Sequence, residues 1–116
     1  MTDDLLAIRP EVREALASGR AIVALESTII AHGLPYPENL SLAHELEAVV
    51  RAEGATPATI ALIGGRIRVG LDDAQLEALA TSRDVTKVSR RDMAAVLASG
   101  GLGATTVAGT MIAARL

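Results

Sequence analysis

The feature that most limits how this chain can fold is an apolar run, Ile22 to Leu25, that stops at the carboxylate of Glu26. Such a run predicts a buried strand. A buried carboxylate is costly unless it is paired or hydrogen-bonded, and active sites of α/β sheets lie at the ends of strands. Glu26 is therefore the first candidate for chemistry. The alternative is that Glu26 caps a turn or meets an arginine.

The rest of the chain alternates between strand and helix patterns. β-prone runs predict further strands at Thr59 to Ile63, Arg66 to Val69 and Val85 to Val88. Apolar periodicity and capping residues predict helices from Pro10 to Gly19, from Asn39 to Glu53, after Asp72, after the Ser89–Asp92 capping box, and from Thr105 to Leu116. Gly64-Gly65 predicts a hairpin. The pattern predicts an α/β fold, with a mixed sheet and helices on both faces.

Two segments carry no such pattern. Met1 to Arg9 is predicted to be a loose arm. Glu26 to Glu38 contains Gly33, Pro35 and Pro37, which predict a loop, and a loop in this position suits a ligand lid.

Composition narrows the class of protein. The 116 residues fit one domain, and Tyr36 is the only aromatic residue, so the core must be built from aliphatic side chains. Such a core favours burial against a partner surface, either further sequence or another subunit. The net charge of -3 gives the chain no positive electrostatic field that would attract nucleic acid. The absence of cysteine excludes thiol chemistry. No signal peptide or membrane-length stretch is recognisable, so we expect a cytoplasmic protein that binds no membrane.

Lys87 and a glycine-rich loop are candidates for anion binding. Lys87 lies between β-branched residues, where desolvation favours an anion partner or a nucleophilic amine; the alternative is a solvated lysine on an edge strand. Gly100 to Gly103 precedes a predicted helix, whose first amides suit phosphate, although a plain turn explains the glycines equally well. Arg66, Arg68, Arg90 and Arg91 could also meet phosphate, although solvated charge is the commoner explanation.

Histidines and acids give no metal site by their spacing. His44 is expected on an exposed helix face, and His32 in the suspected lid, holding the loop or touching a substrate. Asp72 and Asp73 are explained by helix capping. We assign no metal ligand within this chain.

Four ordered stretches resemble the pseudouridine-5'-phosphate glycosidase family. They are Val23 to Pro37, Gly54 to Gly65, Val85 to Asp92 and Gly103 to Ala108. Members of this family are longer, so the resemblance implies that residues 1–116 form the N-terminal part of a single domain whose C-terminal remainder is absent here.

The resemblance implies a reaction and its site residues. The family reversibly cleaves the carbon–carbon bond of pseudouridine 5'-phosphate to uracil and ribose 5-phosphate, uses manganese and forms homotrimers. It places the acid/base glutamate at Glu26, a substrate lysine at Lys87, and a substrate contact at Val107. The imine-forming lysine and the metal-binding aspartate of the family fall outside the matched region, so this chain is expected to be inactive alone. The alternatives are a non-catalytic sugar-phosphate-binding module and a structural remnant that needs a complementing chain.

Overall fold

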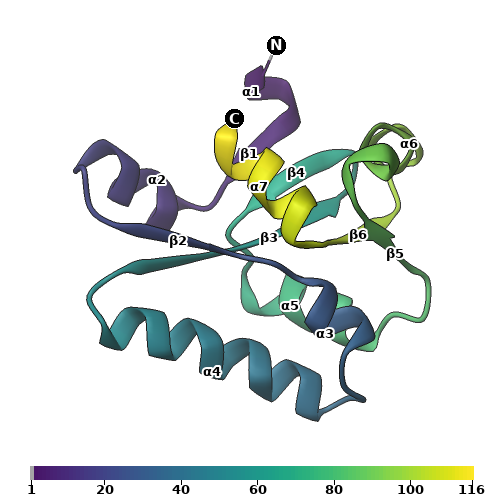
Figure 1. The fold of residues 1–116 in the computed structure, drawn as a ribbon, viewed down its shortest axis with the longest axis horizontal. Helices are drawn as coiled ribbons and strands as arrows, with labels where there is room; N and C mark the ends of the chain where they lie inside the picture. The colour runs from purple at the N-terminus through teal and green to yellow at the C-terminus, as the bar shows by residue number, and fades with distance from the viewer. Residues whose placement is uncertain (1) are drawn as a thin grey trace.

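The computed structural model describes residues 2–116, which form a six-stranded sheet with helices around it (Figure 1). The strands are β1 (Leu6–Ile8), β2 (Ile22–Leu25), β3 (Thr56–Ile63), β4 (Arg66–Val69), β5 (Val85–Val88) and β6 (Leu102–Thr105). The helices are α1 (Thr2–Leu5), α2 (Pro10–Ala17), α3 (Thr28–His32), α4 (Glu38–Ala52), α5 (Asp73–Thr81), α6 (Met93–Ser99) and α7 (Val107–Arg115), with a 3₁₀ turn η1 (Arg90–Asp92) before α6.

The long strand β3 organises the sheet by changing partners halfway along its length. Its first half, Thr56 to Thr59, pairs in parallel with β2. Its second half pairs antiparallel with β4 along Ile60 to Ile63 and with β6 at Ala61 and Leu62. Strand β1 extends the sheet beyond β4, and β5 extends it beyond β6, both in parallel. The sheet is therefore mixed, as the sequence predicted.

Side chains alternate between the two faces of the sheet, and helices cover both. On one face, Ala61 packs with the buried side chains of α3, α4 and α5, including Ile30, Ala43 and Leu76. On the other, Ile60 and Leu62 pack with α6 and α7. This alternation confirms the α/β class with helices on both faces.

Three predicted segments differ from the structure. Leu6–Ile8 is a strand in place of a loose arm, because β4 supplies its hydrogen-bonding partner. Thr28–His32 forms a short helix within the predicted loop. Thr105 ends a strand instead of opening a helix, because Leu102–Thr105 pairs with β3 and β5. The last two errors concern elements that are only four or five residues long, too short to give a clear period.

Other local predictions are confirmed. Strand Ile22–Leu25 has the predicted bounds, but its predicted burial is wrong, because the strand is half-buried and Val23 is 40% exposed. Gly64 and Gly65 both have positive φ, which the turn between β3 and β4 requires. Asp72 caps α5, since its carboxylate accepts the Gln75 amide at 2.8 Å. None of the helices in residues 2–116 has the length and apolar character needed to span a membrane.

Candidate functional site

The carboxyl ends of three strands meet beside the middle of β3. Strands β5 and β6 are parallel, and Val88 at the end of β5 is paired with Thr105 at the end of β6. Strand β2 approaches from the opposite direction, and the Ser27 amide just beyond it donates to the Thr105 carbonyl at 3.0 Å. Thr105 is thus flanked by Val88 on one side and Ser27 on the other. Residues that follow these strands are therefore brought together, although they come from distant parts of the sequence.

Hydrogen bonds from buried hydroxyl groups hold the elements of this junction together. The Ser27 hydroxyl donates to the Ile60 carbonyl at 2.6 Å and accepts the Thr105 amide at 2.8 Å. The Thr105 hydroxyl donates to the same Ile60 carbonyl at 2.8 Å and lies 2.8 Å from the Thr110 hydroxyl on α7. Ser27 and Thr105 are fully buried. The network fixes β2, β6 and α7 relative to one another, because buried hydrogen bonds are costly to break.

Glu26 lies half-buried at this junction, directly after β2. One carboxylate oxygen accepts the Ile29 amide at 3.2 Å and so caps α3, which is the structural role that the sequence left open. The residue also lines a hollow of about 310 Å³, together with Val107, Thr110 and Met111 of α7. The carboxylate therefore combines a fixed orientation with access to an open space.

Lys87 lies on β5, one residue before the Val88 end of the strand. It is exposed and forms no ion pair with any side chain that the structure describes, which are those of residues 4–116. Alternation along the strand places Lys87 on the same face as Val85, which packs under α3, α4 and α5. The cation is thus available to an anion at the edge of the junction.

Val107 is the first residue of α7, and its side chain is 65% exposed. Thr106 caps the helix by accepting the Gly109 amide at 3.2 Å. The amides of Val107 and Ala108 precede the first helical hydrogen bond, so they are free of intrahelical partners. A hollow of about 550 Å³ lies here, lined by Ser89, Arg90, Arg91 and Ala108.

Besides Ser27, two further polar residues near the junction were missed by sequence reasoning. Glu47 of α4 is only 4% exposed, and its carboxylate accepts the Thr59 hydroxyl at 2.6 Å and lies 3.7 Å from Arg51. The Thr28 hydroxyl, next to Ser27, is buried without a hydrogen-bond partner in the described residues. In a one-dimensional pattern Glu47 looks like any polar residue on a helix, so no signal could have found it.

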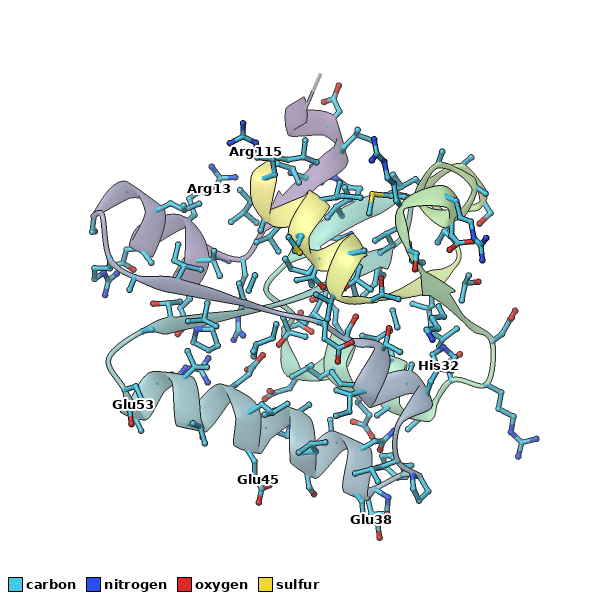
Figure 2. The ribbon with its side chains drawn as sticks, in the orientation of Figure 1. Arg13, His32, Glu38, Glu45, Glu53 and Arg115 are labelled. Atoms are coloured by element: carbon cyan, nitrogen blue, oxygen red, sulfur yellow. The ribbon has the colours of Figure 1, made fainter. Side chains whose placement is uncertain are left out.

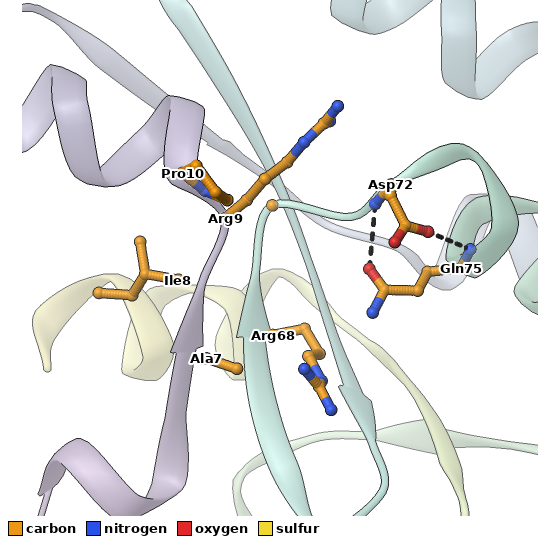
Figure 3. Close-up of a pocket in the computed structure, with 8 residues that line it drawn as sticks. Ala7, Ile8, Arg9, Pro10, Arg68, Asp72 and Gln75 are labelled. Atoms are coloured by element: carbon orange, nitrogen blue, oxygen red, sulfur yellow. Dashed lines mark hydrogen bonds between the residues drawn. The ribbon is translucent and has the colours of Figure 1, made fainter.

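The candidate arginines of β4 bind the chain's own backbone. Arg66 donates to the carbonyls of Asp4 and Leu6, which holds β1 in place. Arg68 donates to the Ile63 carbonyl at 3.4 Å. Arg68 also borders a separate hollow of about 270 Å³, shown in Figure 3. There Arg9 donates to the Leu71 carbonyl at 2.8 Å, and Asp72 and Gln75 bind each other. These polar groups are largely used within the fold.

The histidines are separated and exposed. His44 lies on α4, and His32, labelled in Figure 2, is the last residue of α3. Among the described side chains, those of residues 4–116, no three His, Cys, Asp or Glu residues gather into a group that could hold a metal ion. The residues present therefore do not fit a resident metal ion, and we derive no step through one.

The fold and the junction define a class: an α/β protein with a mixed sheet, whose candidate site lies where strand ends converge. Residues 11–116 match the family model described as indigoidine synthase A like protein, and the chain belongs to that family. A curated relative from Cupriavidus pinatubonensis, named pseudouridine-5'-phosphate glycosidase, is 65% identical over 96% of this chain. The resemblance seen in the sequence is confirmed.

Two solved structures share the fold. The prealnumycin C-glycosynthase AlnA, solved in complex with ribulose 5-phosphate, has a TM-score of 0.87 and 44% identity over 97% of this chain. An indigoidine synthase A-like protein from Thermotoga maritima has a TM-score of 0.81 and 31% identity over 96% of the chain. The chain spans about a third of the length of these proteins, 36% of each structure and 35% of the Cupriavidus relative.

Proposed function

We propose that these residues form the N-terminal part of a pseudouridine-5'-phosphate glycosidase, which reversibly cleaves the carbon–carbon bond of its substrate to uracil and ribose 5-phosphate. The observation that carries the proposal is that Glu26 and Val107 line one hollow at the junction of strand ends, with Lys87 on β5 one residue before the end of that strand. The name of the 65% identical relative supports it. So does the ribulose 5-phosphate bound by AlnA, because that ligand is also a pentose phosphate.

The phosphate of the substrate is proposed to lie between Lys87 and the start of α7. A helix N-terminus presents free amides and a partial positive charge, which suit a phosphate. Lys87 lies on the α3 face of β5, one residue before the strand ends, and its exposed ammonium is proposed to reach the phosphate around that end. Phosphate binding supplies remote binding energy that holds the reacting bond in position.

Glu26 is proposed to move protons at the reacting bond. When the bond between the uracil ring and the sugar breaks, the ring carbon must gain a proton, and a carboxyl group can deliver it. The electron pair of the broken bond stays with the ring carbon, and the electron-poor sugar carbon is attacked by the amine of a lysine; the amine loses a proton, the sugar ring opens with its oxygen protonated, and an imine forms. Water later releases ribose 5-phosphate from that lysine. The family resemblance places this lysine outside the matched region, so Glu26 supplies only part of the machinery.

The whole assembly is proposed to follow the family. Manganese, bound by an aspartate outside these residues, and a homotrimer in the cytoplasm are expected on the same ground. The second candidate function is a non-catalytic sugar-phosphate-binding module. One observation favours it: the exposed Lys87 and the free first amides of α7, which are the groups proposed to bind the phosphate, lie within this chain, whereas the resemblance places the imine-forming lysine outside the matched region.

A chimera tests the proposal. The coding sequence for residues 1–116 is joined to the part of the Cupriavidus relative that the alignment leaves out, and uracil release from pseudouridine 5'-phosphate is measured with manganese. We expect turnover by the chimera and none by the chain alone. A chimera that folds and binds ribose 5-phosphate without turnover would support the binding module instead. Turnover by the chain alone would mean that Lys87 or another residue here replaces the expected lysine.

A further inference from the structure

The outer side of α7 carries an apolar surface that no part of the described chain covers. Val107, Met111 and Ala114 recur at helical spacing along this side, and all three are exposed. Leu116 and Leu16 of α2 are each 57% exposed nearby. We call these five residues the α7 surface. A patch of this kind on a folded domain marks an interaction site more often than scattered single apolar residues do.

Two adjoining hollows make the α7 surface uneven. One, of about 350 Å³, lies between α2, β2 and α7, and its lining is apolar except for Arg115. The other is the hollow beside Glu26, and the two share Ala24 and Ala114 in their linings. Grooves of this shape can accept side chains from a second polypeptide surface. A partner seated here would also border Glu26.

The outer side of α4 has a different character. Glu38, Glu45 and Glu53 project from it into solvent (Figure 2), as expected of a face in contact with water. Val49 is the large apolar side chain exposed on this helix, at 61%. Val49 is therefore about as exposed as Met111, which is 67% exposed. Val49 lies among charged side chains, whereas Met111 lies among apolar ones.

We propose that the α7 surface docks the part of the glycosidase fold that the alignment with the relatives leaves out. This inference rests on the proposed function, because it takes the chain to be one portion of a larger catalytic domain. The Cupriavidus relative has 35% of its length aligned here, which leaves about 65% to be placed. In a single domain that larger portion packs against this one. The α7 surface is the better candidate for the contact, because it is apolar, whereas the outer side of α4 is charged. Docking here brings the missing site residues to Glu26 from the α7 side.

Co-expression tests the docking. The probe is the unaligned portion of the Cupriavidus relative, produced untagged as a separate chain beside tagged residues 1–116. We expect the two to purify together, with the mass of a complex by light scattering. Met111→Glu and Leu16→Glu should each weaken association at least tenfold, and together at least a hundredfold. Val49→Glu is the matched control and should leave association unchanged. Each variant is checked for folding by circular dichroism, and no turnover is needed.

Three outcomes would overturn the docking proposal. The first is failure of the two chains to purify together. The second is a complex that Val49→Glu weakens as much as Met111→Glu does. The third is self-association of the chain alone through this surface, abolished by Met111→Glu, which would assign the surface to a second copy. A complex that forms as expected but shows no turnover would count against the proposed function while leaving the docking intact.

Discussion

Ser27 and Thr105 bind each other through both backbone and side chain, although 78 positions separate them in the sequence. The Ser27 amide donates to the Thr105 carbonyl at 3.0 Å, and the Thr105 amide donates back to the Ser27 hydroxyl at 2.8 Å. This pair joins the end of β2 to the end of β6. Since Glu26 precedes Ser27 and Val107 follows Thr105 by two residues, the pair sets the distance between two candidate site residues.

Ser27→Ala tests how much this pair contributes to the stability of the fold. The change leaves the buried Thr105 amide without its acceptor, and we expect a loss of about 1–3 kcal/mol in the free energy of unfolding, measured with urea. Ser41→Ala, at an exposed position on α4, is the control and should change stability by less than about 0.5 kcal/mol. Equal effects of the two substitutions would show that the buried bonds contribute little.

Glu26→Gln separates the chemistry of Glu26 from its capping role. The amide oxygen of glutamine can still accept the Ile29 amide, so α3 keeps its cap. Glutamine cannot donate the proton that the uracil carbon requires. We expect the chimera to lose turnover by about a hundredfold or more and to keep its affinity for ribose 5-phosphate. Retained turnover would rule out the proton-transfer role.

Lys87→Ala probes the phosphate contact. We expect the chimera to bind ribose 5-phosphate about tenfold more weakly, with its weak affinity for ribose unchanged, as measured by calorimetry or ligand-observed NMR. Arg83→Ala removes another exposed cation from the loop before β5 and should have little effect on either ligand. An equal loss for ribose and its phosphate would argue against the assigned contact.

Gly109→Ala tests how closely α7 must approach the sheet. A Cβ atom at Gly109 would lie 2.6 Å from the Val88 carbonyl oxygen, so the helix would have to move. We expect a loss of about 1–3 kcal/mol, seen as a lower melting temperature. Gly101→Ala is the control, because its Cβ would come no closer than 3.4 Å to the Ser99 hydroxyl. A melting temperature unchanged by Gly109→Ala would contradict the close approach.

The Glu11–Arg51 pair between α2 and α4 gives an expected pH dependence. A hydrogen bond from Arg51, assisted by the charges of Arg51 and Arg9 and opposed by partial burial, holds the pKa of Glu11 below its ordinary value of 4.5. A carboxyl with a lowered pKa in the folded state stabilises the fold above 4.5, and this contribution is lost as the pH falls through the lowered pKa. Glu11→Gln should remove the contribution. Urea unfolding should show a variant deficit that is full at pH 7 and shrinks as the pH is lowered below 4.5, and the deficit should be small because both side chains are well exposed.

The elements found from the sequence are those with local signals. The strand at Val85–Val88, the Gly64-Gly65 turn and the Asp72 cap each depend on residues that lie next to one another in the chain. Strand β6 gave no such signal, because Gly103 and Ala104 lack the side chains that mark a strand. A Cβ at Gly103 would lie 2.7 Å from the Val88 side chain, so packing within the fold favours this glycine.

The candidate site also contains residues that a local signal in the sequence identifies and residues that no local signal identifies. Glu26 was found because a carboxylate after an apolar run is visible in the sequence, whereas the assignments of Lys87 and Val107 depended on family resemblance. Ser27 and Glu47 were not singled out and Thr105 was expected only as a helix start, since the importance of all three comes from partners far along the chain. Hydrogen bonds of this kind exist only after the sheet has formed, so no local pattern could predict them.

The change of partners along β3 also bears on the order of folding. The hairpin of β3 and β4 is closed by a two-residue turn, so its ends meet at little entropic cost. The second half of β3 can therefore gain a partner early. The first half of β3 pairs with β2, whose partner residues lie more than thirty positions earlier in the sequence. The second half also pairs with β6, whose partner residues lie about forty positions later. Both pairings therefore close much longer loops than the hairpin does. We expect the hairpin to form first and the junction that holds Glu26 to be completed among the last long-range contacts.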